Sequence, residues 1–297
     1  MDDVIVSSGP YSFRIRDNTL WSSDKKTIYS RNFKIGGNTV ADCVNVSIIY
    51  ENGIPIYAYM PSLFADPECS LTQPLDKGGG TVAMIKTLLS YVSSQIPSLT
   101  HIRFDDKSQI ECATEEEIQK GSRFRKKGTN VKPMPLYYFS IAFNGQTWYE
   151  RHFNAQQMDE MRHRSYRDKV EEFLYSSDFK KQYGFDRFVS LFGKSEDEMT
   201  ELSGYYTKSN TFNEFFRAIP KKRHCELVGS WISQFMRIML NTTFSNNDWI
   251  IPLQMNGGNS KKKKRLTKTR KYYCPKGIIT NNYQERNICL HPEDVYN

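Results

Sequence analysis

The segment from residue 44 to residue 104 constrains the fold of this chain more than any other part of its sequence. Two apolar runs flank Glu51-Asn52-Gly53, and Asn-Gly readily takes the positive φ angles of a tight hairpin turn. Three glycines, 78–80, then lead into a stretch with apolar residues at helical spacing, which Pro97 ends. Residues 100–104 alternate as strands do. We therefore predict a hairpin, a glycine turn, a helix and a strand, in that order.

The predicted elements of this segment have defined limits. The hairpin strands are expected at Val44–Tyr50 and Ile54–Met60, and the helix at about Thr81 to Ile96. One face of this helix should pack on a sheet, because apolar side chains recur there every three or four residues. That face consists of Val82, Ile85, Leu88, Leu89 and Val92.

The rest of the chain favours a short strand first and helices later. A strand is predicted at Tyr11 to Arg16, an exposed insertion at 107–135, and helices from about Arg164 to Leu240. Residues 136–153, LYYFSIAFNGQTWYERHF, fit a strand at their start and a helix in their second half, and periodicity does not decide between them. Strand-like sequence returns at 248–255.

These elements predict a mixed α/β (α+β) protein with a mostly antiparallel sheet and a mainly helical C-terminal extension. Three regions are expected: a mixed core over 1–163, the helical extension over 164–256, and a basic tail with an irregular C-terminus over 257–297. Two hydroxyl–carboxylate pairs, Ser195 with Glu198 and Thr211 with Glu214, match the capping box that starts a helix.

Composition excludes several classes of protein. No apolar run approaches the roughly 20 residues that span a bilayer, and the start lacks a secretory pattern. We therefore expect no membrane partner and an intracellular protein, cytoplasmic or nuclear. The six cysteines should be reduced, and Cys274, Cys289 and His291 fit no common zinc spacing, so no metal site is predicted.

The positive charge is concentrated in one short segment. The chain has 41 basic and 33 acidic residues, and residues 261–271, KKKKRLTKTRK, hold the whole excess of 8. Such a run is typical of a nuclear-import signal, of a contact with nucleic acid or an acidic protein, or of a solvated linker. The candidate contact residues are Lys261, Lys262, Lys263, Lys264, Arg265, Lys268, Arg270 and Lys271.

The glycine turn has two interpretations. Glycines let backbone amides approach a ligand closely, and a helix starting at about Thr81 presents unpaired N–H groups that favour an anion such as pyrophosphate. The same glycines could simply cap the helix. A Walker loop is excluded, because no Gly-Lys-Ser/Thr follows. The candidate anion-binding residues are Lys77, Gly78, Gly79, Gly80 and Thr81.

The order of hairpin, glycine turn, helix and strand resembles the central motif of the GNAT N-acetyltransferase family. In that family a loop of the form Arg/Gln-x-x-Gly-x-Gly/Ala holds the coenzyme A pyrophosphate. This chain has Leu75-Asp76-Lys77-Gly78-Gly79-Gly80, with Leu at the Arg/Gln position. A later helix of the family carries Ala and Tyr and ends in Gly-Phe, and residues 142–153 resemble it without that ending. The resemblance covers about residues 44–155.

The resemblance implies a reaction and a cofactor. An acetyl group would pass from acetyl-CoA to an amine of a protein or a small molecule, and Tyr149 would protonate the departing thiolate. Tyr149 also suits a core aromatic, since its segment is rich in aromatics. The sequence does not rank a general base among six carboxylates near the expected cleft. They are Glu51, Asp66, Glu68, Asp105, Asp106 and Glu111.

A second function is compatible with the same residues. A protein that keeps this fold without catalysis would bind nucleic acid or partner proteins through its surfaces and basic tail. The composition, rich in Lys, Asn and Tyr, is also similar to that of uncharacterised proteins of large DNA viruses, which implies a virion or host-interaction role.

Overall fold

The computed structural model describes most of the chain in separate stretches. They are residues 3–23, 26–37, 42–76, 78–110, 134–185, 196–229, 231–241, 249–253, 280–283 and 286–288. Residues 1–256 form one unit and residues 257–297 a second. In the second unit, β11 (Thr280–Tyr283) and β12 (Arg286–Ile288) form an antiparallel pair.

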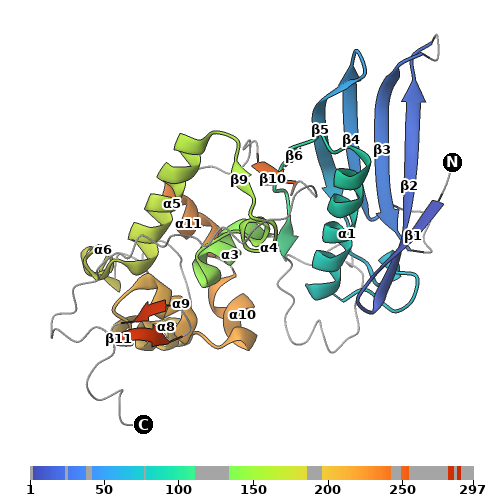
Figure 1. The fold of residues 1–297 in the computed structure, drawn as a ribbon. Helices are drawn as coiled ribbons and strands as arrows, with labels where there is room; N and C mark the ends of the chain where they lie inside the picture. Colours follow the sequence, from blue (N-terminus) through green and yellow to red (C-terminus); the bar gives the residue numbers. More distant parts are fainter. Residues whose placement is uncertain are drawn as a thin grey trace. The chain divides into compact units, whose positions relative to one another are not determined.

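The first unit is built on an eight-stranded sheet of order β1-β2-β3-β4-β5-β6-β10-β9 (Figure 1). Its neighbouring strands are antiparallel except for the parallel pair β5–β6, so the predicted mixed α/β fold with a mostly antiparallel sheet is confirmed. The strands are β1 (Asp3–Ser8), β2 (Tyr11–Trp21), β3 (Ile28–Gly36), β4 (Val44–Glu51), β5 (Ile54–Leu63), β6 (His101–Phe104), β9 (Gln156–Gln157) and β10 (Trp249–Pro252).

The predicted hairpin is the β4–β5 pair. Asn52 has φ 51° and Gly53 φ 79°, so both central residues take the positive φ angles that a tight turn requires. The two strands begin and end close to the predicted limits, although β5 continues three residues further, to Leu63. This hairpin fixes which face of the sheet receives the apolar side chains of β4.

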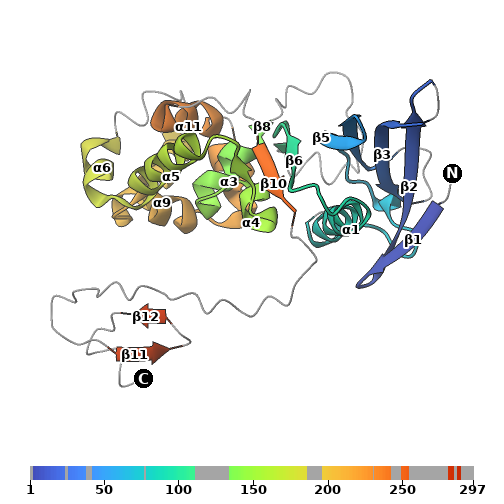
Figure 2. The same cartoon turned by 45° about the horizontal axis from the view of Figure 1, so that its top comes forward.

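Helix α1 (Gly79–Gln95) covers one face of the N-terminal strands (Figure 2). As predicted, it buries Ile85, Leu88, Leu89 and Val92, whereas Val82 is only partly buried. These side chains join the same apolar core as alternate residues of β2 and β3. The partners on the strands are Phe13, Ile15, Phe33 and Ile35.

The N-terminal strands are more extensive than the sequence indicated. The predicted strand at Tyr11–Arg16 is the first half of β2, which continues to Trp21 and pairs with β1 on one side and β3 on the other. Strands β1 and β3 were not predicted, because their polar residues obscure the alternation that burial reveals.

The aromatic segment at 136–153 is helical throughout most of its length. It forms α3 (Leu136–Asn144) and α4 (Trp148–Phe153), and Gly145, with φ 74°, separates them. Thr147 and Glu150 form a capping box at the start of α4. The alternative that periodicity left open is thus decided in favour of helix. The short strands β7 (Gln109–Ile110) and β8 (Met134–Pro135) pair at the base of the predicted insertion.

The second half is mainly helical, as predicted. Among the described residues it contains α5 (Glu160–Tyr175), α6 (Ser177–Gln182), α8 (Glu196–Lys208), α9 (Phe212–Ala218), η2 (Lys221–Arg223), α10 (His224–Val228) and α11 (Ile232–Leu240). Phe173, Phe212 and Phe235 pack together at their centre, with ring centroids 5.0 to 5.7 Å apart. Thr211 caps α9 as expected, by accepting a hydrogen bond from the Glu214 N–H at 3.2 Å, whereas Ser195 lies outside the described residues.

After the helices the chain returns to the sheet. β10 pairs with β6 on one side and β9 on the other, so residues near 250 lie beside residues near 103.

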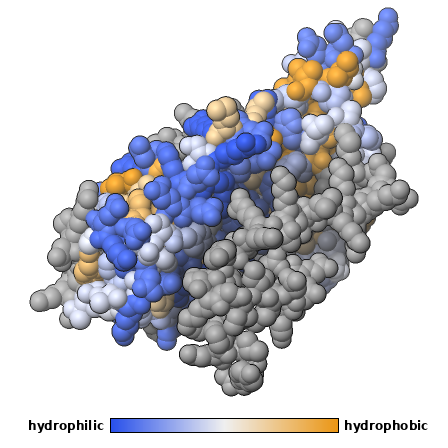
Figure 3. All heavy atoms as spheres, turned by 60° about the vertical axis from the view of Figure 1, so that its left-hand side comes forward, coloured by the Kyte–Doolittle hydropathy of each residue, from blue (hydrophilic) through white to orange (hydrophobic). Residues whose placement is uncertain are grey.

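Hydrophilic side chains predominate on the face shown in Figure 3, with hydrophobic ones scattered among them. In the part of the chain that is described, no helix has the length and apolarity needed to cross a membrane.

Candidate active site

Two aspartates, Asp105 and Asp106, follow strand β6 directly. β6 pairs in parallel with β5 at Tyr59↔Arg103, and α1 makes the connection between these strands. The carboxyl ends of parallel strands meet at one edge of a sheet, which is where ligands bind in many α/β folds. This edge is therefore the first place to look for chemistry in this fold.

Asp106 is a buried carboxylate. Only 6% of its surface is exposed, and it accepts hydrogen bonds from the Ser108 N–H, at 3.1 Å, and from the Ser108 hydroxyl. Burial raises the pKa of Asp106 to about 6, against the effect of the two hydrogen bonds, and the charge of Glu150 raises it further. Asp106 can therefore gain or lose a proton close to neutral pH.

Two phenols are close enough to Asp106 to be affected by its charge. Burial raises the pKa of Tyr149, and the charge of Asp106 raises it further. The pKa of Tyr137 is raised by the same two causes in the same order. The Tyr149 ring packs on Phe104, with centroids 4.4 Å apart, which fixes it beside the end of β6. Both phenols keep their protons at neutral pH and can act as hydrogen-bond donors.

Glu150 has a structural role in the same region. Its carboxylate accepts a hydrogen bond from the Thr147 N–H at 2.7 Å and another from the Tyr166 hydroxyl at 2.9 Å. Arg167 lies 3.5 Å from its other oxygen. Because these contacts join the start of α4 to α5, Glu150 holds the helix that carries Tyr149.

The structure describes five of the six carboxylates that the sequence left unranked: Glu51, Asp66, Glu68, Asp105 and Asp106. Of these five, Asp106 is the buried one. Glu51 and Glu68 are exposed, and Glu111 lies outside the described residues. Asp105 is partly exposed and accepts a hydrogen bond from the Tyr59 hydroxyl at 3.1 Å. Burial therefore distinguishes Asp106 from the other described candidate carboxylates, and the sequence alone does not show which of them is buried.

The glycine turn is occupied by a carboxylate of the chain itself. Gly78 has φ 122° and precedes the first turn of α1, whose Gly80 N–H donates to Asp76 Oδ1 at 2.7 Å. The Tyr11 hydroxyl donates to the same oxygen. The Tyr11 hydrogen bond lowers the pKa of Asp76 against the opposing effect of burial, and the amides of Gly80 and Gly79 lower it further. Asp76 therefore remains an anion at the start of the helix.

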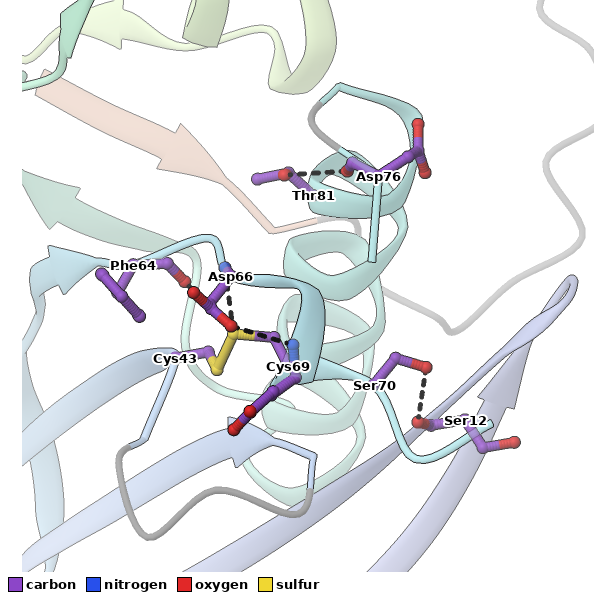
Figure 4. The surroundings of a disulfide bond; sticks show 9 residues. Ser12, Cys43, Phe64, Asp66, Cys69, Ser70, Asp76 and Thr81 are labelled. Carbon is purple, nitrogen blue, oxygen red and sulfur yellow. Dashed lines mark hydrogen bonds between the residues drawn. A yellow bond between two sulfur atoms is a disulfide. The ribbon is translucent and has the colours of Figure 1, made fainter. Parts of the chain in front are cut away.

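The structure also describes Thr81 and Leu75 of the predicted loop. The Thr81 hydroxyl donates to the Asp76 backbone carbonyl at 3.5 Å (Figure 4). Leu75, which stands at the family's Arg/Gln position, is buried in the core. Lys77 and the basic run at 261–271 lie outside the described residues, as do Cys274, Cys289 and His291.

A disulfide joins the start of β4 to η1 (Pro67–Cys69), in the segment that leads to the glycine turn (Figure 4). Cys43 and Cys69 are 26 residues apart in sequence, and their Cα atoms are 6.0 Å apart. The expectation of reduced cysteines is wrong for this pair and for Cys225, which is also disulfide-bonded. Sequence spacing gave no sign of it, because the two residues meet only when the loop after β5 folds back against β3 and β4.

Sequence reasoning also missed two members of this region. Tyr137 was read only as part of an aromatic segment, and Asp76 only as part of the loop motif. A carboxylate just before a run of glycines that opens a helix is a signal for capping, since Asp favours the free amides of a helix start.

Comparisons with protein-family models, with curated proteins and with solved structures find no match for this chain.

Proposed function

We propose that this chain is an acyl-CoA-dependent N-acetyltransferase-type protein that transfers an acetyl group to an amine, with Asp106 as the proton acceptor. The observation that carries the proposal is the buried Asp106 carboxylate at the end of β6, beside two phenols. A general base works best when its pKa lies near the working pH. The order of hairpin, glycine turn, helix and strand, on which the family resemblance rests, supports the same proposal.

The proton balance follows from the pKa values. Acetyl-CoA, when bound, supplies the acetyl group as a thioester, whose C–S bond breaks as the amine nitrogen forms the new N–C bond. Asp106 takes the proton that the nitrogen loses. A thiol has an ordinary pKa of about 8.5, so a carboxylic acid of pKa about 6 can pass that proton to the departing sulfur. Tyr149, whose pKa is raised, is better suited to donate a hydrogen bond to the sulfur than to give up its proton.

The glycine turn is suited to bind an oxyanion, because it already binds one, the carboxylate of Asp76. The backbone of Gly79 and Gly80 would hold the pyrophosphate of coenzyme A only after Asp76 leaves, since the two anions repel. A Cβ at Gly80 would lie 2.5 Å from Asp76 Oδ1, so the turn has no room for a side chain beside this carboxylate. Asp76 is therefore the residue on which cofactor binding should depend most.

The test compares thermal stabilisation by acetyl-CoA in three variants. Because a ligand that binds the native state raises the melting temperature, wild type should show a rise and Asp76→Ala a larger one. Gly79→Asp should abolish the rise in melting temperature, because the new carboxylate adds a negative charge to the turn. Asp66→Ala, which removes the carboxylate that caps η1, is the matched control and should respond as wild type does.

Activity separates binding from chemistry. Asp106→Asn should keep the thermal response to acetyl-CoA but release no thiol in the presence of an amine panel. If neither wild type nor Asp76→Ala responds to millimolar acetyl-CoA, the proposal is refuted.

A second function, binding without catalysis, is favoured by three specific observations. Asp76 fills the helix start, Leu75 is buried where the family has Arg or Gln, and Asp106 and Tyr149 are only 6% and 4% exposed. On this alternative, the chain uses its surfaces and the basic run at 261–271 to bind nucleic acid or an acidic partner protein, as in a viral structural protein. An absent response to acetyl-CoA, together with salt-dependent binding of nucleic acid, would favour this function.

A further inference from the structure

A pocket lies between α1, the end of α4 and the end of β10, and we name it the α1–β10 pocket. It has a volume of about 390 Å³, which is in the range of sites for small ligands. Helix α1 contributes Lys86, Ser90 and Ser93 to its lining. These residues lie on one face of the helix because they are three or four residues apart. It plays no part in the acetyl transfer proposed above.

The charge of this pocket is positive. None of the described residues that line it is acidic, and Lys86, an exposed side chain, supplies a cation. Burial lowers the pKa of His152, and the charges of Arg151 and Lys86 lower it further. His152 is therefore a neutral hydrogen-bonding group near neutral pH, and the nearby cations repel a protonated amine. The acceptor amine of the proposed reaction is thus a poor fit here.

Apart from Asn154, the rest of the lining is apolar. Phe153 and Leu253 are buried side chains with 7% and 8% of their surface exposed, and Leu89 and Ile251 lie beside them. Phe153 is held in place by its contact with the Tyr149 ring, at 6.1 Å between centroids. A ligand would therefore meet apolar side chains as well as a cation, hydroxyls and an imidazole.

We propose that the α1–β10 pocket binds a small organic anion, with its carboxylate or phosphate beside Lys86 and its apolar body against Phe153 and Leu253. The neutral His152 and the hydroxyl of Ser90 are available to donate hydrogen bonds to the same anionic group. The lining thus offers both a cation and an apolar surface, as an amphiphilic anion requires.

Isothermal titration calorimetry of the full chain tests this proposal with three probes. Hexanoate and phenyl phosphate should bind, and the stronger of the two identifies the anionic group. Hexanol, which matches hexanoate without the charge, should bind about tenfold more weakly or worse, because it cannot form the charge-assisted hydrogen bonds of the anion.

Two variants locate the binding. Lys86→Glu should weaken hexanoate at least about tenfold by reversing the charge beside it. Ser90→Phe should block the pocket sterically while circular dichroism and the melting temperature remain those of wild type, because Ser90 is exposed. Lys222→Glu makes the same charge change at an exposed lysine of η2, outside the pocket, and should bind as wild type does. The proposal is overturned if both anions fail to bind at millimolar concentration, or if both pocket variants bind them as wild type does.

Discussion

Replacing Asp106 by asparagine should make the protein more stable near neutral pH. Asparagine has nearly the same shape and can still accept hydrogen bonds from Ser108, but it carries no charge. The burial that raises the pKa of Asp106 is a cost for the charged form, and the variant removes this cost. A residue that is kept at such a cost is a mark of a functional site.

The magnitude follows from the pKa. An aspartate with an ordinary pKa of 3.8 in the unfolded chain and about 6 in the native state is harder to ionise after folding, by about 3 kcal/mol. The native state therefore binds the proton more tightly. The contribution of this group to stability is fully present below about pH 4 and is lost as pH rises to about 6. Asp106→Asn should thus exceed wild type by up to about 3 kcal/mol at pH 7 and should match it near pH 4.

Urea denaturation of both proteins at several pH values measures this difference. The free energy of unfolding of the variant minus that of wild type should grow between about pH 4 and pH 6 and then level off. Asp105→Asn is the matched control: it changes the neighbouring, partly exposed carboxylate and should show no comparable gain. The reasoning is refuted if Asp106→Asn is less stable than wild type at pH 7, or if the difference does not change with pH.

Two further predictions concern the disulfide and the basic run. Replacing Cys43 and Cys69 together by serine should lower the free energy of unfolding by about 3.5 kcal/mol, because the bond restricts the unfolded chain over 26 residues. Urea denaturation measures this difference. Equal stability of wild type with and without a reductant would contradict the prediction. Replacing Lys261–Arg265 by alanine should weaken binding to nucleic acid at low salt and flatten its salt dependence, since fewer counterions are released. Alanine at the five basic residues between Lys120 and Lys127 is the matched control for charge, and a larger effect there would contradict the prediction.

Local patterns in the sequence determined the central elements of the fold. Asn52-Gly53 specified the β4–β5 hairpin, and the apolar spacing between the glycine turn and Pro97 specified α1 and its buried face. Both signals depend on residues close together in the chain, so they can be read without knowing what the elements pack against. The helical character of the second half followed from the same kind of periodicity.

Contacts between distant segments were decided only by the tertiary structure. The sequence did not show that β10 lies beside β6, that Cys43 meets Cys69, or that Asp106 alone is buried among the five candidate carboxylates that the structure describes. Each of these depends on which surfaces the folded chain brings together, and no local spacing encodes that. The pKa of Asp106 is the clearest case, because its main cause is the loss of water around the carboxylate, and only the packed protein excludes that water.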